Sequence, residues 1–280
     1  MTGAPPRSEC APDARRFIDM KQRGEKIVAL TAYDAPTARI LFEVGVDVIL
    51  VGDSVGVNML GYAHEREVTL ADMAHHIAAV RRGAPHAYVM GDLPYAAYDT
   101  PTQARASARA LRDAGADCVK FEGAGPAVAE AIVSAGVAVC GHLGLESQHH
   151  AEKRRQGRTA EAARRLLDDS RALDAAGQAF LVLELVPAEV AARISAAVRA
   201  PTIGIGAGAA TDGQVLVVND MAGITARDFK HSRRYGEIGA ALRAAVAAYV
   251  KDVRAGAFPT QAHAFHMAPE ERAIFERERM

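Results

Sequence analysis

The chain alternates short apolar runs with longer stretches of helical pattern, and this alternation limits the possible folds more than any other feature. Eight runs rich in Val, Ile and Leu span residues 26–30, 47–51, 87–91, 117–121, 136–141, 179–185, 202–205 and 215–218. Nearly every residue in these runs is apolar, which is typical of parallel strands buried on both faces. Because helical patterns separate most of the runs, the sequence predicts repeated βα units.

Capping residues support the same division into helices and strands. Thr69 is placed to cap a helix over residues 70–82, and Thr100 with Pro101 opens another that runs to residue 114. Glycines stand where helices should end, at positions 45, 83, 115, 136 and 177. Near the C-terminus, residues 237–253 have an amphipathic pattern, and we expect this helix to complete the ring around the strands.

These patterns predict a single-domain α/β fold, a (β/α)8 barrel of the TIM type, for which 280 residues are sufficient. A doubly wound open sheet is the alternative, since alternation alone does not prove that the sheet closes. We expect an N-terminal arm over residues 1–22, the barrel over 23–265 and a charged C-terminal tail over 266–280. Residues 270–280 could instead form a helix on a subunit surface, but the tail is favoured.

Charge and cysteine usage indicate which partners to expect. Lysine plus arginine (33) nearly balances aspartate plus glutamate (34), so the net charge gives no indication that the protein binds nucleic acid or an acidic membrane. Residues 1–15 lack the apolar run of a signal peptide, and no window approaches a membrane span. Cys10, Cys118 and Cys140 have no zinc-like spacing. We therefore expect a cytoplasmic protein whose partners are small molecules.

Polar residues end five of the apolar runs, at the position where the active site of such a barrel lies. Because the carboxyl ends of all strands meet at one rim, we expect these side chains to share a site. Lys120 and Glu122 are two apart on one strand, so both project to the same face. The strand-end polar residues are Asp53, Ser54, Asp92, Lys120, Glu122, His142 and Glu184.

Three of these residues predict a metal site. Asp53, Asp92 and Glu122 come from consecutive strands, and hard carboxylates without a nearby cysteine suit Mg²⁺. Lys120 could then neutralise a substrate carboxylate beside the metal. In the alternative interpretation, the acids pair with Lys120 or cap helices. Uncompensated buried charges cost several kcal/mol each, which disfavours this explanation for the whole set of polar residues.

Glu184 is the candidate base, since it is an isolated acid within Leu-Val-Leu-Glu-Leu-Val. We expect desolvation to raise its pKa toward that of a useful general base, although a salt bridge to a neighbouring strand is the alternative. For His142, structural support and direct catalysis both remain open. The glycines of residues 204–208 lack dinucleotide-binding spacing and indicate close approach of the backbone to substrate or to a neighbouring loop.

A series of ordered motifs spans about residues 26–265. They are Thr31-Ala32-Tyr33-Asp34, Val51-Gly52-Asp53-Ser54, Val68-Thr69-Leu70, Asp92-Leu93-Pro94, Val119-Lys120-Phe121-Glu122-Gly123, Gly141-His142-Leu143-Gly144-Leu145, Gln156-Gly157-Arg158-Thr159, Glu184-Leu185-Val186-Pro187 and Asp212-Gly213-Gln214. In this order they resemble the ketopantoate hydroxymethyltransferase family, the magnesium-dependent barrel enzymes of pantothenate and coenzyme A biosynthesis.

The resemblance implies a reaction and roles for particular residues. The reaction would transfer a hydroxymethyl group from 5,10-methylenetetrahydrofolate to 3-methyl-2-oxobutanoate through a magnesium-stabilised enolate, giving 2-dehydropantoate (ketopantoate) and tetrahydrofolate. A large homo-oligomer, a homodecamer in the family, is also implied. The implied roles are Glu184 as general base, Asp53, Asp92 and Glu122 for one Mg²⁺ per subunit, and Asp53, Ser54, Asp92 and Lys120 for the keto acid, to which we add His142.

The chain departs from the family pattern in its rim loops. Glu146-Ser147-Gln148 stands in place of Thr-Pro-Gln, a basic Lys153-Arg154-Arg155 follows, and Asn219-Asp220 replaces His-Asp. These changes leave open a paralogue that acts on another branched 2-oxo acid, a magnesium-dependent 2-oxo-acid carbon–carbon lyase, or a non-catalytic protein that binds folate or keto acid. The presence of Glu184 argues against a protein that only binds its ligand, because binding would not require an isolated buried base.

Overall fold

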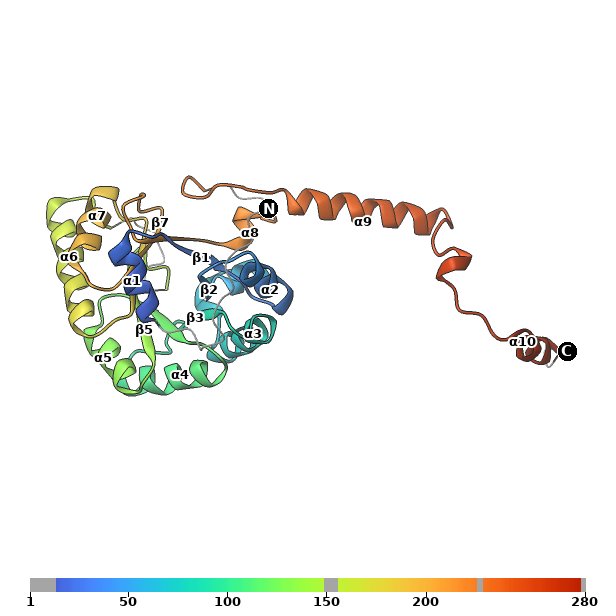
Figure 1. The fold of residues 1–280 in the computed structure, drawn as a ribbon, viewed down its shortest axis with the longest axis horizontal. Coiled ribbons are helices and arrows are strands. Elements are labelled where there is room, and N and C mark those ends of the chain that lie inside the picture. The colour runs from blue at the N-terminus through green and yellow to red at the C-terminus, as the bar shows by residue number, and fades with distance from the viewer. Residues whose placement is uncertain (1–13, 149–155, 226–228, 278–280) are drawn as a thin grey trace.

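Eight parallel strands close a barrel in the computed structural model, which describes residues 14–148, 156–225 and 229–277 (Figure 1). Spatial order follows the chain, and β8 pairs with β1 to complete the closure. The predicted (β/α)8 barrel is thus confirmed, and the open sheet is excluded. The strands are β1 (Ile27–Thr31), β2 (Val48–Val51), β3 (Tyr88–Asp92), β4 (Cys118–Glu122), β5 (Ala138–Gly144), β6 (Phe180–Glu184), β7 (Thr202–Ile205) and β8 (Gly213–Leu216).

Helices α2 to α7 surround the strands (Figure 1). The helices are α1 (Arg15–Arg23), α2 (Ala35–Glu43), α3 (Leu70–Gly83), α4 (Pro101–Asp113), α5 (Pro126–Ser134), α6 (Ala160–Ala175), α7 (Ala188–Ala197), α8 (Val218–Met221), α9 (Ile238–Arg254) and α10 (Pro269–Arg277), with a short π-helix, η1 (Gly56–Leu60), and two short 3-10 helices, η2 (Glu65–Glu67) and η3 (Gln261–His263). A continuous apolar layer between this ring and the strands forms the larger part of the core.

The predicted helix caps are present. Thr69 Oγ1 accepts a hydrogen bond from the Asp72 N–H (3.1 Å), and the Asp72 carboxylate accepts one from the Thr69 N–H (2.9 Å), so α3 begins with a capping box. Thr100 accepts from the Gln103 N–H (3.2 Å) at the start of α4. Each cap satisfies a backbone donor that the first turn leaves unpaired.

Strand β8 begins two residues earlier than the predicted 215–218. A Cβ at Gly213 would lie 2.5 Å from the Ile27 carbonyl oxygen, so glycine at this position allows β8 to approach β1 and close the barrel. Val218, the end of the predicted strand, instead begins α8, and its N–H donates to Thr31 Oγ1 (3.0 Å).

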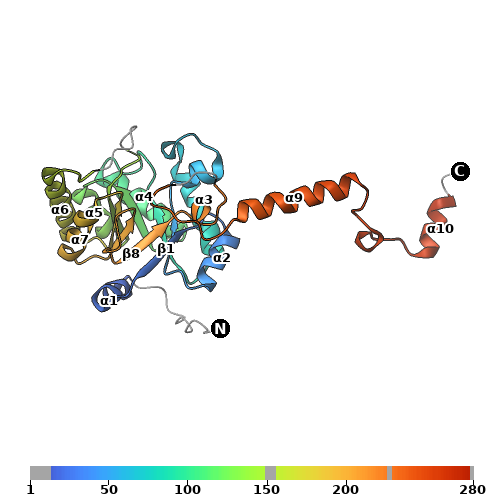
Figure 2. The ribbon, with the colours of Figure 1, turned by 90° about the horizontal axis from the view of Figure 1, so that it is seen from above.

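Helix α1 closes the N-terminal end of the barrel. Phe17 is fully buried, and its ring packs edge-on against Tyr88 (5.0 Å between centroids) and Phe180 (4.9 Å), the first residues of β3 and β6. Figure 2 shows α1 beyond the start of β1. The segment predicted as an arm therefore contains a packed helix, whereas residues 1–13 lie outside the described part of the chain.

Helices α9 and α10 extend away from the barrel in both views (Figures 1 and 2). The prediction that the helix over residues 237–253 completes the ring of its own barrel is therefore wrong, although the segment is helical. Hydrogen bonds from the N–H groups of Ile238 and Gly239 to the carbonyls of Ala222 and Gly223 attach the first turn of α9 beside α8. The helix then leaves the barrel surface.

The C-terminal segment forms an exposed helix over Pro269–Arg277. The residues predicted as a charged tail are therefore helical over this range, because Pro269 at the first turn followed by Glu270 and Glu271 suits a helix N-terminus. Among the described residues, no helix combines the length and apolar character needed to cross a membrane.

Replacing Phe17 by Ala should lower the free energy of unfolding by about 3–5 kcal/mol, since it leaves a cavity between two aromatic rings. Urea denaturation followed by circular dichroism measures the change. Ile18→Ala, which trims an exposed side chain of the same helix, is the matched control and should change stability far less. Equal denaturation midpoints for the two variants would contradict the closing role of Phe17.

Candidate active site

A cleft of about 1070 Å³ opens at the end of the barrel where the strands finish. The pairing register brings the predicted residues to this rim, because Asp92 lies beside Lys120 on the neighbouring strand and Glu122 lies beside His142. Glu184 pairs with Gly144 one strand further on. The predicted residues that line the cleft are Asp53, Ser54, Asp92, Lys120, Glu122, His142 and Glu184.

The Lys120 ammonium lies at the floor of the cleft, 3.0 Å from Asp92 Oδ2, and both side chains are almost fully buried. Burial lowers the pKa of Lys120, but the charges of Asp92, Asp53 and Glu122 outweigh burial and raise it above its usual value. Lys120 therefore stays charged at neutral pH. Asp92 Oδ2 also accepts from the Asp53 N–H (3.2 Å), whereas the buried Oδ1 has no hydrogen-bond partner.

Asp53 lies where the surrounding side chains carry an excess of negative charge. Burial and the Asp92 carboxylate raise the pKa of Asp53 to about 7, although Lys120 acts in the opposite direction. Asp53 Oδ2 accepts a hydrogen bond from Gln148 Nε2 at 2.7 Å. Ser54 lies beside it, with its Oγ 2.9 Å from the hydroxyl of Tyr33.

Glu122 differs from the two aspartates because protein donors reach both of its oxygens. Oε2 accepts from the Gln148 N–H (2.9 Å), and Oε1 accepts from Ser147 Oγ (3.3 Å). His142 Nδ1 lies 3.6 Å from the same Oε1. Within the described ranges, no group of three His, Cys, Asp or Glu side chains is arranged to hold a metal ion, so Asp53, Asp92 and Glu122 remain predicted ligands.

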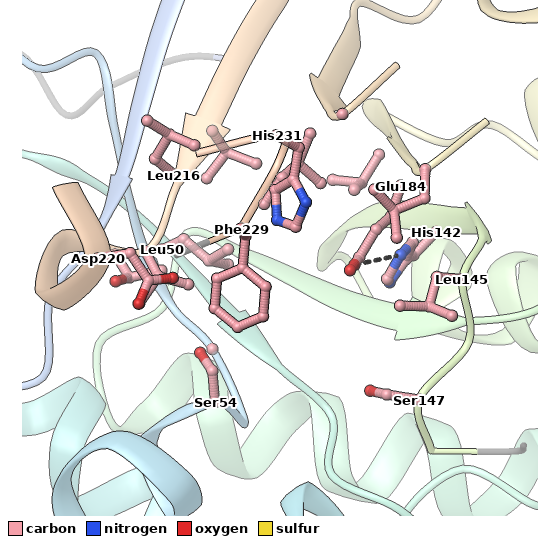
Figure 3. Close-up of a pocket in the computed structure, with 18 of the residues that line it drawn as sticks. Leu50, Ser54, His142, Leu145, Ser147, Glu184, Leu216, Asp220, Phe229 and His231 are labelled. Carbon is pink, nitrogen blue, oxygen red and sulfur yellow. Dashed lines mark ion pairs between the residues drawn. The ribbon is translucent and has the colours of Figure 1, made fainter. Parts of the chain in front are cut away.

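Glu184 and His142 form a pair at the side of the cleft (Figure 3). Their Oε2 and Nε2 atoms are 3.3 Å apart, an electrostatic contact without the alignment of a good hydrogen bond. His142 is buried, and its Nδ1 also lies 3.4 Å from Lys120 Nζ. The Glu184 side chain keeps 26% of its surface exposed. Its carboxylate is therefore accessible from the cleft.

The expected rise in the pKa of Glu184 is wrong. Burial does raise this pKa, but contact with His142 and the charges of His142 and Lys120 outweigh burial, so the net pKa is lowered. For His142, burial and Lys120 lower the pKa, whereas Glu184 and Glu122 raise it, and the net direction is upward. The opposite shifts describe an ion pair in which each member stabilises the charged form of the other.

The glycine-rich segment after β7 lies against the turn that follows Glu184. Gly206 has φ +65°, and a Cβ there would lie 2.5 Å from Leu185 Cδ2 and 2.9 Å from His231 Cβ. Leu185 itself has φ +51°, a left-handed conformation that costs about 1 kcal/mol or more outside glycine. The prediction of close approach to a neighbouring loop is confirmed.

Several residues that line or support the cleft had no clear sequence signal. Gln148 is fully buried under the acids, and Figure 3 shows Phe229, His231 and Asp220 across the cleft from Glu184. A polar residue soon after the end of β5 could have pointed to Gln148. Residues 149–155, which include the basic replacement in the rim loop, lie outside the described residues. Asn219 is buried and has its Nδ2 3.5 Å from the Asn58 carbonyl oxygen.

Comparison with known proteins identifies relatives along nearly the whole chain. Residues 13–261 match the family model described as ketopantoate hydroxymethyltransferase. The 3-methyl-2-oxobutanoate hydroxymethyltransferase of Desulfotalea psychrophila is 47% identical over 89% of this chain and 92% of the relative, and that of Methylococcus capsulatus is 48% identical over 89% and 95%. The structure of phosphoenolpyruvate phosphomutase from Streptomyces platensis subsp. rosaceus shares the fold, with a TM-score of 0.60 and 13% identity over 95% of this chain and 96% of that one. The chain belongs to the ketopantoate hydroxymethyltransferase family.

Proposed function

We propose that this chain transfers a hydroxymethyl group from 5,10-methylenetetrahydrofolate to 3-methyl-2-oxobutanoate, giving 2-dehydropantoate and tetrahydrofolate in pantothenate biosynthesis. The observation that carries the proposal is that Glu184, Lys120 and Asp92 face one cleft in a chain of this family. A carboxylate base beside a fixed positive charge suits removal of a proton next to a carbonyl group.

Glu184 is the proposed general base. Its lowered pKa keeps the carboxylate ionised at neutral pH and therefore able to accept the C3 proton of the keto acid. His142, 3.3 Å away, holds the carboxylate at the edge of the cleft. The electron pair left at C3 would form the new carbon–carbon bond to the one-carbon unit of the donor. Both carbon–nitrogen bonds that hold this unit to the folate would break, one water molecule would supply the hydroxyl oxygen, and the folate nitrogens would take up two protons.

Lys120 is the proposed partner for negative charge on the substrate. Its ammonium is buried and stays protonated, so it is positioned before the substrate arrives. Fixed charges in a water-poor site stabilise developing charge more strongly than they do in water. Lys120 therefore suits both the carboxylate of the keto acid and the oxygen on which charge develops.

One Mg²⁺ per subunit is the proposed cofactor, held by Asp53, Asp92 and Glu122. Three observations fit a divalent cation: Asp92 Oδ1 is buried without a partner, the donors are all hard oxygens, and three acids face one ammonium. The raised pKa of Asp53 reflects that excess of negative charge. Each oxygen of Glu122 accepts one protein hydrogen bond, which orients the carboxylate and leaves a second lone pair on each oxygen for the cation. When bound, Mg²⁺ supplies a Lewis acid that polarises the keto group.

The folate donor is proposed to occupy the outer part of the cleft. A volume of about 1070 Å³ is more than a small 2-oxo acid needs and is within the range of larger ligands. The stacked rings of Phe229 and His231 offer an aromatic surface. Arg158 and Lys230, which also line the cleft, provide positive charge suited to the carboxylates of a folate.

The alternatives receive less support. The lyase alternative rests on likeness of fold alone, because this chain is only 16% identical to the 2,3-dimethylmalate lyase whose structure it resembles. The transferase family model, by contrast, matches residues 13–261 of the sequence. Binding without turnover gives no reason for the contact between Glu184 and His142. Another branched 2-oxo acid would use the same residues and remains the second candidate substrate.

We place the protein in the cytoplasm. Its two described cysteines, Cys118 and Cys140, are buried free thiols in the barrel interior. Reduced thiols suit a reducing compartment.

A homo-oligomer is the proposed assembly, and a decamer is the size that the family implies. The support comes from α9, where an apolar stripe lies in solvent with exposures of 44–61%: Ile238, Leu242, Val246, Tyr249 and Val253. On the barrel, Val28 of β1 is 48% exposed, although helices normally cover the outer face of such a strand. Val44, next to α2, is 70% exposed. A second copy of the chain would supply an apolar partner for both surfaces.

Glu184→Gln should abolish exchange of the C3 proton of 3-methyl-2-oxobutanoate with D₂O, with a loss of about 10²–10⁴-fold, because the amide cannot accept the proton. NMR in the presence of Mg²⁺ measures the exchange, and adding methylenetetrahydrofolate to the wild-type protein then tests for 2-dehydropantoate. Exchange at the wild-type rate in the variant would exclude Glu184 as the base. Absence of both exchange and product with folded wild-type protein would refute the proposed reaction.

Asp92→Ala should raise the dissociation constants of both Mg²⁺ and the keto acid by about tenfold or more, since it removes a proposed metal ligand and the carboxylate that lies 3.0 Å from the Lys120 ammonium and holds it in place. Isothermal titration calorimetry measures both constants. Glu184→Gln serves as the control and should retain both affinities. Unchanged binding in folded Asp92→Ala would exclude Asp92 from the metal site.

Val246→Asp should weaken self-association by at least about tenfold, since losing the burial of one valine removes about 1.5 kcal/mol. Analytical ultracentrifugation over a range of concentrations measures the dissociation constant. Ala244→Asp introduces the same charge two residues away, outside the apolar stripe, and should have a smaller effect. If Val246→Asp has the dissociation constant of the wild-type protein, the apolar stripe of α9 is not part of the interface between subunits.

A further inference from the structure

Gln148 connects the acidic residues at the floor of the cleft. The residue follows β5 and is fully buried. Its N–H donates to Glu122 Oε2 (2.9 Å), and its Nε2 donates to Asp53 Oδ2 (2.7 Å) and to the Leu93 carbonyl (3.1 Å). Its Oε1 accepts from the Tyr98 hydroxyl (2.6 Å). One residue thus contacts acids that come from two different strands.

The chemistry of its neighbours determines which way the Gln148 amide faces. The Leu93 carbonyl can only accept a hydrogen bond, so the NH₂ group must face it and Asp53. The amide oxygen then faces the Tyr98 hydroxyl, which donates. The reverse orientation would place the amide oxygen against a carbonyl and a carboxylate, and would leave buried groups unpaired.

These contacts restrict how the acids can turn. Gln148 engages one oxygen of Asp53 and one of Glu122, while the Asp53 N–H and Lys120 engage Asp92 Oδ2. The fixed carboxylates leave Asp92 Oδ1 as a buried oxygen without a partner. An amide is a suitable donor here because it orients a carboxylate without bringing a second positive charge that would repel a cation.

We propose that Gln148 is a positioning residue whose side-chain amide orients Asp53 for binding a divalent cation, beside Glu122, to which its backbone N–H donates. This inference rests on the proposed cation site and adds the group that organises it. Ligands that are already oriented bind a metal more tightly, and loss of an outer partner typically weakens binding by about 10–100-fold.

The test measures the dissociation constant of Mn²⁺ without substrate, from the electron paramagnetic resonance signal of the free ion. Gln148→Met keeps the length of the side chain but removes the amide, and should raise the constant by about tenfold or more. Gln156→Met makes the same chemical change in the segment that leads into α6, where Gln156 Nε2 lies 3.4 Å from Glu146 Oε1, and should leave the constant unchanged. Circular dichroism establishes that each variant is folded.

Gln148→Asn provides a second variant if Gln148→Met does not fold. It retains the amide but is one methylene too short to reach Asp53, so weakened Mn²⁺ binding is again expected. Wild-type affinity in folded Gln148→Met or Gln148→Asn would overturn the positioning role while leaving the proposed cation site intact. If the wild-type protein itself bound no Mn²⁺, both the cation site and this inference would fail.

Discussion

A single buried ammonium, that of Lys120, makes the acidic floor of the cleft possible. Removing an ion from water costs several kcal/mol, and like charges held close together repel, so Asp53, Asp92 and Glu122 could not share this space without a compensating charge. Lys120 lies 3.0 Å from Asp92 and close enough to the other two for their charges to raise its own pKa. The ammonium offsets part of the negative charge, and the remainder supports the proposal of a cation at this site.

Local patterns in the sequence predicted the barrel and most of its rim. Burial on both faces produces continuous apolar runs, which is why residues 202–205 were predicted with the bounds that β7 has. The rim was predictable for a related reason: a polar residue such as Asp92 or Lys120 at the end of an apolar strand faces the mouth of the barrel. The start of β8 was missed because it depends on the contact between Gly213 and Ile27, which are far apart in the sequence.

Other features depend on neighbours in space that no pattern along the chain reveals. Glu184 has a lowered pKa because His142 and Lys120 come from other strands to meet it. The contacts of Gln148 require the loop after β5 to return over β2 and β4. Helix α9 has the amphipathic pattern of a packed helix, but that pattern does not specify which surface it covers.

The packing of Phe17 also affects how water reaches the site. With α1 filling the N-terminal end, the described interior of the barrel meets solvent at the mouth, where Glu184 is partly exposed. Protons leaving Glu184 and ligands entering the cleft would therefore share one opening. A large molecule seated there would slow the exchange of a proton held by Glu184, in its proposed role as base, with bulk water. Because Phe17 and its aromatic neighbours fill the N-terminal end of the barrel, a ligand bound at the mouth would limit how much water reaches Glu184.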